Sequence, residues 1–249
     1  MVQPYLRKGG KPERELDLQL KYTFECMEAP ETDCMLALEH PELYSIALNG
    51  NVIDQQDAGF WIDPVLRKLR IPADFLRTGE NELILRGKYH EDLPGLESLF
   101  LLGEFGVFDE KIGRLPDSID WGDWCSRGFP AYGGNFTYRM PLPSVPDGRS
   151  FLSVPEWRGS AVGIRINGSE EQLLISPPYR VELTDLLKHD GSDMAEIRIY
   201  GHRRNVFGPF YLKEKWPAWT GPAQFKILET EQRQTVPCGI LSAPCVETI

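Results

Sequence analysis

The residues of this sequence that could do chemistry are aromatic side chains set beside polar ones in segments rich in glycine and proline. Flat aromatic rings offer apolar surface to a small ligand, and nearby carboxylate, amide and guanidinium groups can hold its polar atoms. The candidate ligand-binding residues of this kind are Trp121, Asp123, Trp124, Tyr132, Trp157, Arg203, Asn205, Trp216 and Trp219. Their chemistry is that of binding, and it needs no cofactor.

Each aromatic candidate also has a structural interpretation. Trp157 can be a packing residue at the start of a strand. Trp121 and Trp124 can fill the junction between two domains. Trp216 and Trp219 can dock against another domain of a larger protein. If these rings lie in an open groove beside polar groups, recognition is favoured, whereas a flat apolar patch favours docking.

Arg203 and Asn205 follow a predicted strand, and alternation places them on one face of the chain. An arginine fork suits vicinal hydroxyls or a carboxylate. The alternative is that this pair fixes the strand ends through hydrogen bonds to backbone carbonyls. Both interpretations predict that the two side chains act locally.

The acidic residues do not predict a catalytic pair. A glycosidase needs two carboxyl groups roughly 5–9.5 Å apart. Asp63, Glu104, Asp120 and Asp123 are the candidates, but no spacing singles out two of them. We expect Glu104 to be partly buried and paired, because its segment alternates little. No catalytic residue is therefore assigned.

Cysteine and histidine spacing predicts neither a metal site nor a disulfide framework. The five cysteines, Cys26, Cys34, Cys125, Cys238 and Cys245, include no CxxC pair. The four histidines show no HxH or HExxH arrangement. Buried thiols are the expected state, and they weakly favour a reducing, cytoplasmic compartment. An extracellular or periplasmic location is the alternative if the chain is a fragment.

Charge excludes several classes of partner and separates the chain into halves. The 249 residues carry a formal net charge of −10. Residues 1–120 hold 13 basic and 23 acidic groups, whereas residues 121–249 hold 14 of each. No basic stripe offers a footprint for a nucleic-acid backbone, and no apolar run approaches the ~18 residues of a membrane span. We therefore expect neither nucleic acid nor membrane as a partner.

Alternating runs bounded by Gly, Pro, Asn and Asp predict an all-β chain. Helical turns are expected only at Pro72–Leu76 and Thr184–Leu187. In the first half, strands are expected at Leu18–Cys26, Met35–Glu39, Tyr44–Leu48, Lys68–Ile71, Glu82–Gly87 and Ser98–Phe108. In the second half, they are expected at Asn135–Pro141, Phe151–Val154, Ala161–Ile166, Gln172–Ile175, Tyr179–Leu183, Ala195–Gly201, Ala223–Leu228, Thr235–Pro237 and Ile240–Leu241.

An internal repeat indicates two copies of one sandwich. Asn49-Gly50 and Asn167-Gly168 each end a predicted strand, and Asn-Gly is a strong hairpin signal. Tyr22 and Tyr138 stand at the start of the two copies. Similar features follow each hairpin in the same order, at an offset of about 112–118 residues. The fold class predicted is therefore two tandem antiparallel β-sandwiches, each of ordinary domain size.

The second copy resembles the jelly-roll, galactose-binding-like domain of family-2-type glycoside hydrolases. The matching strings are Tyr138-Arg139, Trp157-Arg158-Gly159-Ser160-Ala161, Ile166-Asn167-Gly168 and the turn from Val181 to Leu187. Three further strings resemble the C-terminal regions of α-L-rhamnosidase-like glycosidases: Leu101–Phe105, Gly128–Gly134 and Arg204–Pro209. In those families the catalytic carboxylates lie in a separate domain, which this sequence lacks.

The resemblance implies a flexible segment at 1–14, a divergent acidic sandwich at 15–112 and a second galactose-binding-like sandwich at 113–249. It also implies a non-catalytic, carbohydrate-binding accessory region of a larger glycoside hydrolase. The partner would be a glycan or a neighbouring catalytic domain of the same polypeptide. The alternatives are a structural scaffold without a ligand and, less favoured, a free-standing glycosidase. We expect the ligand in the neutral second copy.

Overall fold

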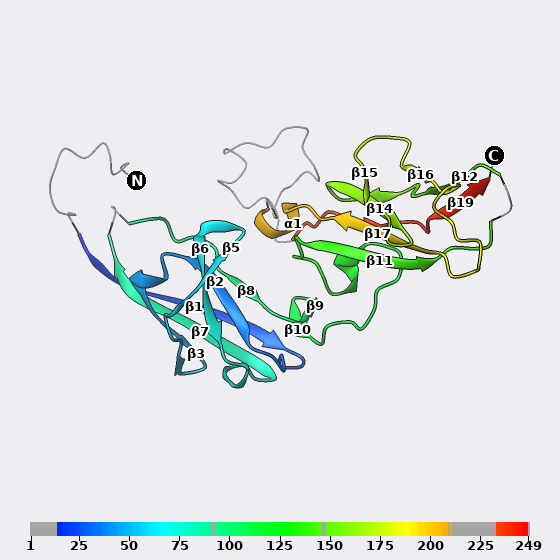
Figure 1. The fold of residues 1–249 in the computed structure, drawn as a ribbon. Coiled ribbons are helices and arrows are strands. Elements are labelled where there is room, and N and C mark those ends of the chain that lie inside the picture. The colour runs from blue at the N-terminus through cyan, green and yellow to red at the C-terminus, as the bar shows by residue number, and fades with distance from the viewer. Residues whose placement is uncertain (1–13, 91–92, 146–147, 209, 211–232, 249) are drawn as a thin grey trace, which may run out of the picture. The chain divides into compact units, whose positions relative to one another are not determined.

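The computed structural model describes residues 14–90, 93–145, 148–208, 210 and 233–248, and it is built almost entirely of strands (Figure 1). The chain divides into two compact units, residues 1–116 and 117–249. Every strand pair is antiparallel in the described ranges except a single parallel bridge, Cys26 to Ile112. The predicted all-β fold of tandem antiparallel sandwiches is confirmed.

The first unit consists of two sheets, with strand orders β4-β3-β7-β1-β10-β9 and β5-β6-β2-β8. Two short 3-10 helices, η2 (Pro41–Leu43) and η3 (Ala73–Phe75), connect them. The strands are β1 (Leu16–Cys26), β2 (Cys34–Glu39), β3 (Tyr44–Leu48), β4 (Asn51–Val52), β5 (Asp57–Trp61), β6 (Asp63–Ile71), β7 (Gly79–Tyr89), β8 (Phe100–Leu102), β9 (Gly106–Phe108) and β10 (Lys111–Gly113).

The second unit has a four-stranded sheet in the order β11-β17-β14-β15 and a three-stranded sheet in the order β16-β12-β19. A short ladder pairs β13 with β18. Two helical turns are present, η4 (Trp124–Arg127) and α1 (Arg204–Phe207). The strands are β11 (Asn135–Pro141), β12 (Ser150–Ser153), β13 (Trp157–Arg158), β14 (Ala161–Ile166), β15 (Gln172–Leu174), β16 (Arg180–Glu182), β17 (Met194–Tyr200), β18 (Gly239–Ile240) and β19 (Cys245–Thr248).

The two units share one topology, as the repeat predicts. The order β4-β3-β7-β1 in the first unit corresponds to β15-β14-β17-β11 in the second, and β6-β2-β8 corresponds to β16-β12-β19. The register corrects one pairing of the repeat. Tyr138 lies opposite Ile197, and the equivalent of Ile197 on β7, Leu85, lies opposite Leu20. The counterpart of Tyr138 is therefore Leu20, two residues before Tyr22.

A partly buried polar cluster recurs at the same place in both units, and we call it the hub: Asn49 with Asn81 in the first unit, Asn167 with Asp193 in the second. In the first unit Asn49 donates from Nδ2 to Phe75 O (2.8 Å) and to Asn81 Oδ1 (2.7 Å), and its Oδ1 accepts from Glu82 N (2.9 Å). The residue has a positive φ of 50°, which asparagine tolerates better than most residues. One side chain thus fastens the end of β3 to the turn before β7.

The second hub repeats the three hydrogen bonds of the first asparagine, with one charge added. Asn167 donates to Leu186 O (2.9 Å) and Asp193 Oδ1 (2.6 Å), and it accepts from Met194 N (3.0 Å). Where the first hub has the amide Asn81, the second has the carboxylate Asp193. The pKa of Asp193 lies below its ordinary value, chiefly because the backbone N–H of Lys188 donates a hydrogen bond to the carboxylate.

This difference predicts that acid weakens the second hub and not the first. Because the folded-state pKa of Asp193 is depressed, its contribution to stability is present above the unfolded-state pKa and is lost as pH falls through the folded pKa. Asp193→Asn should therefore flatten the acid dependence of unfolding of the second unit below about pH 4. Hydrogen exchange of β14 and β17 amides across pH measures this. An unchanged acid slope in the variant would contradict it.

Each unit has its own hydrophobic core between its sheets. Alternation along β14 turns Val162, Ile164 and Ile166 inward, and all three are buried. In the first unit Leu36, Leu69 and other strand residues form the equivalent cluster. Burying such side chains is the main favourable term in folding.

Several expected elements differ from the structure. Ser98–Phe108 is two strands, β8 and β9, because the chain bends at residues 103–104 between them. Thr235–Pro237 is not a strand. Ala223–Leu228 lies outside the described residues. Strands β4, β5, β10, β13 and β19 and the helical turns η2, η4 and α1 were not expected.

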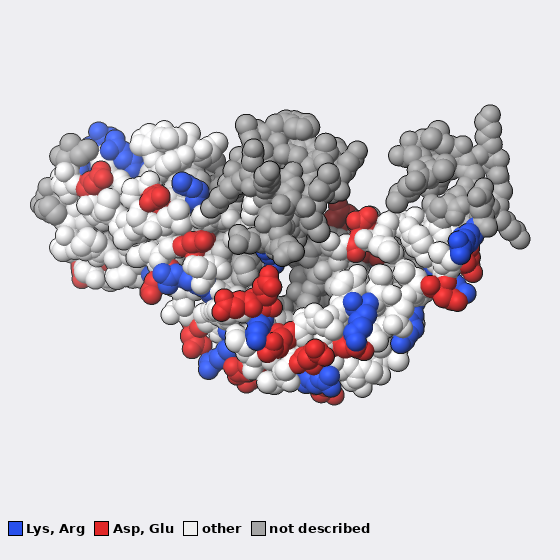
Figure 2. All heavy atoms as spheres, turned by 180° about the vertical axis from the view of Figure 1, so that it is seen from behind, with Lys and Arg blue, Asp and Glu red and all other residues white. Residues whose placement is uncertain are grey.

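The charged surface is mixed in sign. Figure 2 shows acidic and basic side chains next to one another on one face of the molecule. Ion pairs are frequent among the described residues, for example Lys111 Nζ with Glu25 Oε2 at 2.8 Å and Arg149 Nε with Glu182 Oε1 at 2.9 Å. Residues 1–120 nevertheless keep an excess of ten acidic groups over basic ones.

Candidate functional site

Trp124, one of the predicted ligand-binding residues, is fully buried and packs in the core of the second unit. Its ring centroid lies 4.8 Å from that of Phe136 and 6.0 Å from that of Tyr132. Trp121 is half-buried, and its ring lies against Tyr138 at 5.1 Å. The ring of Trp124 is thus covered by other side chains of the protein and offers no surface to a ligand, and the ring of Trp121 offers only part of its surface.

Asp123 and Asn205 act as local anchors. Asp123 caps η4, and its Oδ1 accepts from Cys125 N (3.0 Å) and Cys238 N (2.9 Å). Asn205 is buried, donates to Val236 O (2.8 Å) and accepts from Val236 N (2.8 Å). Both side chains therefore fix the segment that leads into β18, and Asn205 has the local backbone role that its sequence position allowed.

The remaining predicted residues lie nearer to solvent. Tyr132 is 38% exposed, and its hydroxyl donates to Asn135 O at 3.2 Å. Trp157 is half-buried and meets Tyr179 edge-on at 5.1 Å. Arg203 is exposed at the start of α1. Trp216 and Trp219 lie outside the described residues. Among the described candidates, the side chains most accessible to a ligand are therefore those of Tyr132, Trp157 and Arg203.

Four of the five cysteines are buried free thiols, and Cys245 is exposed. Burial raises the pKa of Cys34 to about 11 and that of Cys238 to about 11. A thiol with a raised pKa is a poor nucleophile. Glu104, expected to be partly buried, is exposed.

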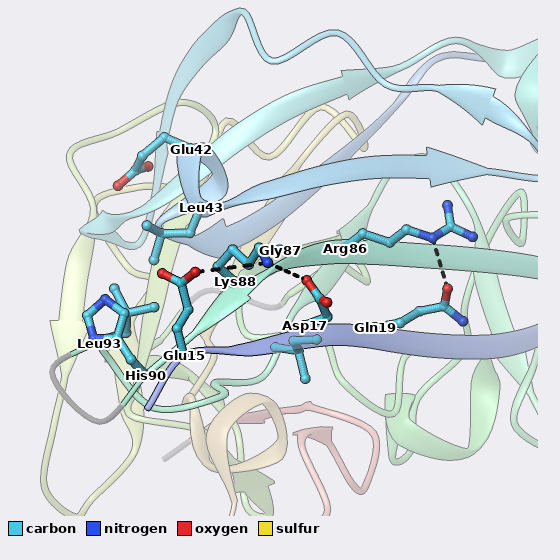
Figure 3. Close-up of a pocket in the computed structure, with 11 residues that line it drawn as sticks. Glu15, Asp17, Gln19, Glu42, Leu43, Arg86, Gly87, Lys88, His90 and Leu93 are labelled. Atoms are coloured by element: carbon cyan, nitrogen blue, oxygen red, sulfur yellow. Dashed lines mark hydrogen bonds and ion pairs between the residues drawn. The ribbon is translucent and has the colours of Figure 1, made fainter. Parts of the chain in front are cut away.

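An open groove in the first unit is a candidate site that the sequence did not indicate (Figure 3). It has a volume of about 790 Å³. The walls come from the start of β1, the end of β7 and η2, and three leucines contribute apolar surface. The lining residues are Glu15, Asp17, Leu18, Gln19, Glu42, Leu43, Arg86, Gly87, Lys88, His90 and Leu93.

Lys88 lies between two carboxylates of the groove. Its Nζ is 2.6 Å from Asp17 Oδ1 and 3.9 Å from Glu15 Oε1. The hydrogen bond to Asp17 is the first cause of the raised pKa of Lys88. Next along the same face, Arg86 Nε donates to Gln19 Oε1 at 2.8 Å. Asp17 lies opposite Lys88, and Gln19 lies opposite Arg86, on the neighbouring strands β1 and β7. These cross-strand contacts already orient the donors and acceptors that the groove presents.

The wall formed by η2 depends on a glycine. A Cβ on Gly87 would clash with Leu43 O and lie 3.2 Å from a ring carbon of Tyr44. With no side chain there, η2 approaches the β7 backbone closely, and Leu43 borders the groove. Glu42, also in η2, accepts from His40 Nδ1 at 2.9 Å, and this bond lowers the pKa of Glu42.

The groove was missed because its residues are spread along the sequence on three separate elements. Asp17, Gln19, Arg86 and Lys88 are ordinary outward positions of two alternating strands. Only the β1–β7 register brings Asp17 opposite Lys88. The one signal available was the alternation itself, which predicts outward faces but not which strands are neighbours.

No group of three or more potential metal ligands occurs in the described part of the chain. Nor does any helix there have the length and apolar character that a membrane span requires.

Comparison with known proteins finds no matching family model and no matching curated protein. Among solved structures, the chain is similar to a rhamnosidase from Novosphingobium sp. PP1Y, with 14% identity and a TM-score of 0.38 over 95% of this chain and 22% of that one. It is also similar to the Streptomyces avermitilis α-L-rhamnosidase complexed with L-rhamnose, with 14% identity and a TM-score of 0.29 over 78% of this chain and 23% of that one. The chain thus spans less than a quarter of either.

Proposed function

We propose that this chain is a non-catalytic, carbohydrate-binding accessory region of a larger glycoside hydrolase, and that the groove of the first unit holds the sugar. The groove is the single observation that carries the proposal. Its volume lies within the ~300–1,000 Å³ usual for small-ligand sites. It combines leucine surface with oriented carboxylate, amide, ammonium and guanidinium groups, which is the chemistry that hydroxyl-rich ligands require.

The charge balance of the groove favours a neutral ligand. The lining holds three carboxylates, Glu15, Asp17 and Glu42, and two cations, Arg86 and Lys88, so the two signs nearly offset each other. A polyanion would meet three carboxylates, and a cation would meet two fixed positive groups. A neutral sugar accepts from the cations and donates to the carboxylates at the same time.

A structural scaffold is the second candidate, and one observation favours it. Strand β15 lies at the edge of its sheet, and it and the residue after it expose Leu173 (54%) and Ile175 (73%). Exposed apolar side chains on an unpaired edge are typical of a surface that another chain covers. The scaffold function predicts that a neighbouring domain docks on this edge, and that substitutions in the groove leave the docking unchanged.

Lys88→Met tests the proposal. The change keeps the length of the side chain and removes the ammonium, so we expect sugar affinity to fall by roughly tenfold, the loss typical of one charge-assisted hydrogen bond. Calorimetric titration of the full chain with the glycan that it binds measures the change.

Lys21→Met is the matched control. Lys21 stands on the same face of β1, pairs with Glu82 of β7 and lies outside the groove. Its loss should leave affinity unchanged. Equal losses in both variants would indicate a general effect of surface charge and would count against the groove.

A further inference from the structure

A second, smaller cleft lies on the first unit, between the segment Val52–Ala58 and the end of β6 with η3. Its volume is about 290 Å³, close to the lower limit for small-ligand sites. It shares no lining residue with the groove. Neither the sequence patterns nor the fold assigns it a role.

One side of the cleft is apolar and rigid. Phe75 and Pro72 form it, together with Val52, which is 75% exposed. Phe75 is fixed through its backbone, because its N–H donates to Pro72 O (3.0 Å) and its carbonyl accepts from Asn49 of the hub (2.8 Å). The side chain of Phe75 is partly buried against the core of the first unit, which positions its ring. A ring positioned in this way can serve as a preformed platform for the apolar face of a ligand.

The other side is polar and already oriented. Arg70 Nε donates to Asp33 Oδ2 at 2.6 Å, and Asp33 Oδ1 accepts from Ala73 N at 3.0 Å. Arg70 is therefore anchored through Asp33 to η3, and its side chain stays 63% exposed. Asp54 forms a local turn by accepting from Gln56 N at 3.1 Å.

The charges of the cleft nearly cancel. Arg70 is paired with Asp33, and Asp57 is paired with Arg67. Asp54 is the remaining carboxylate of the lining. An anion would meet the carboxylate of Asp54 beside an arginine that is already paired. A cation would meet only one carboxylate of the lining that has no ion pair with a described residue, because Asp57 is already paired with Arg67. Neither charged class fits well.

We infer that this cleft is a second binding site for a small neutral polyhydroxy ligand with one apolar face, such as a single pyranose unit. The ring of Phe75 receives the apolar face. Arg70 donates to hydroxyl oxygens, and Asp54 and Gln56 take the remaining hydroxyls. The inference rests on the proposed carbohydrate-binding function, and it makes the first unit a two-site module.

The test is an amide chemical-shift titration of the full chain with D-glucose, D-galactose, D-mannose and L-rhamnose in turn. Two variants remove the cleft chemistry. Phe75→Leu removes the ring and should fold normally, because Leu186 has the same hub position in the second unit. Arg70→Met removes the fork. Lys88→Met, which alters only the groove, is the control.

We expect at least one sugar to shift amides of residues 52–58 and 70–75. Both cleft variants should weaken that response by roughly tenfold, and Lys88→Met should leave it unchanged. Shifts confined to the groove, or cleft shifts that persist in both cleft variants, would overturn the inference while the proposed function stood. Cleft shifts without any groove response would overturn the groove assignment instead.

Discussion

Trp124→Ala should lower the free energy of unfolding of the second unit by about 3–5 kcal/mol, the range for removing a large buried aromatic side chain. Trp124 is fully buried and contacts the rings of Phe136 and Tyr132. Its backbone is tied independently, since its N–H donates to Cys238 O at 2.9 Å. The loss therefore reports on the ring. Denaturant unfolding followed by hydrogen exchange of β11 and β17 measures it.

Trp124→Phe is the control, because it keeps an aromatic ring in the core and removes only part of the buried volume. The indole Nε1 has no hydrogen-bond partner in the described ranges. The phenylalanine variant thus loses volume but no polar contact, and it should be markedly milder than alanine. If alanine and phenylalanine cost the same, or if alanine costs less than about 1 kcal/mol, the core role of Trp124 is wrong and a ligand platform becomes the better interpretation.

Replacing either hub asparagine by alanine should have the next largest effect. Asn49→Ala removes three hydrogen bonds at once. Phe75 O and Glu82 N lose this partner, whereas Asn81 Oδ1 still accepts from Arg77 N at 3.0 Å. Each buried partner left unsatisfied costs about 1–3 kcal/mol, so we expect a loss of about 3 kcal/mol in the first unit. Asn167→Ala should do the same in the second.

Glycine is the control for backbone strain. Asn49 and Asn167 have φ values of 50° and 51°, which glycine adopts without the penalty of a side chain. Asn49→Gly should thus be less damaging than Asn49→Ala but should still lose the hub bonds. Hydrogen exchange must localise each loss to the unit that carries the change. Equal destabilisation of both units by one substitution would contradict two separate hubs.

The fold was largely predictable because its signals are local. Alternation gives β11 and β14 with their observed bounds, and the Asn-Gly pairs mark both hairpins. The short strand β4 escaped because two residues show no periodicity. Strand β19 pairs with β12 across about 95 residues, a contact that no local pattern reveals.

The candidate site was less predictable because its residue types are ordinary. Aromatic side chains attract attention in a sequence, yet a ring such as that of Trp124 serves a core as well as a ligand. Lys88 and Asp17 gain meaning only from the register that sets them opposite each other. The predicted ligand in the neutral half stays a prediction, carried by Tyr132, Trp157 and Arg203 among the described residues.

The domain limits at 15–112 and 113–249 also stay a prediction. The boundary between the two compact units falls between residues 116 and 117 of the sequence. The acidic excess of the first half now has a physical setting. Several of its carboxylates are paired with neighbouring cations, as Asp17 is with Lys88 and Asp33 with Arg70. An acidic copy is thus compatible with binding a neutral ligand.

The most direct test of the central claim is a glycan-array measurement on the full chain, with hydrolysis of aryl glycosides assayed on the same preparation. The proposed function predicts binding to at least one glycan and no hydrolysis of any glycoside. Absence of binding to every glycan would contradict carbohydrate recognition, and release of the aryl group would contradict a non-catalytic role.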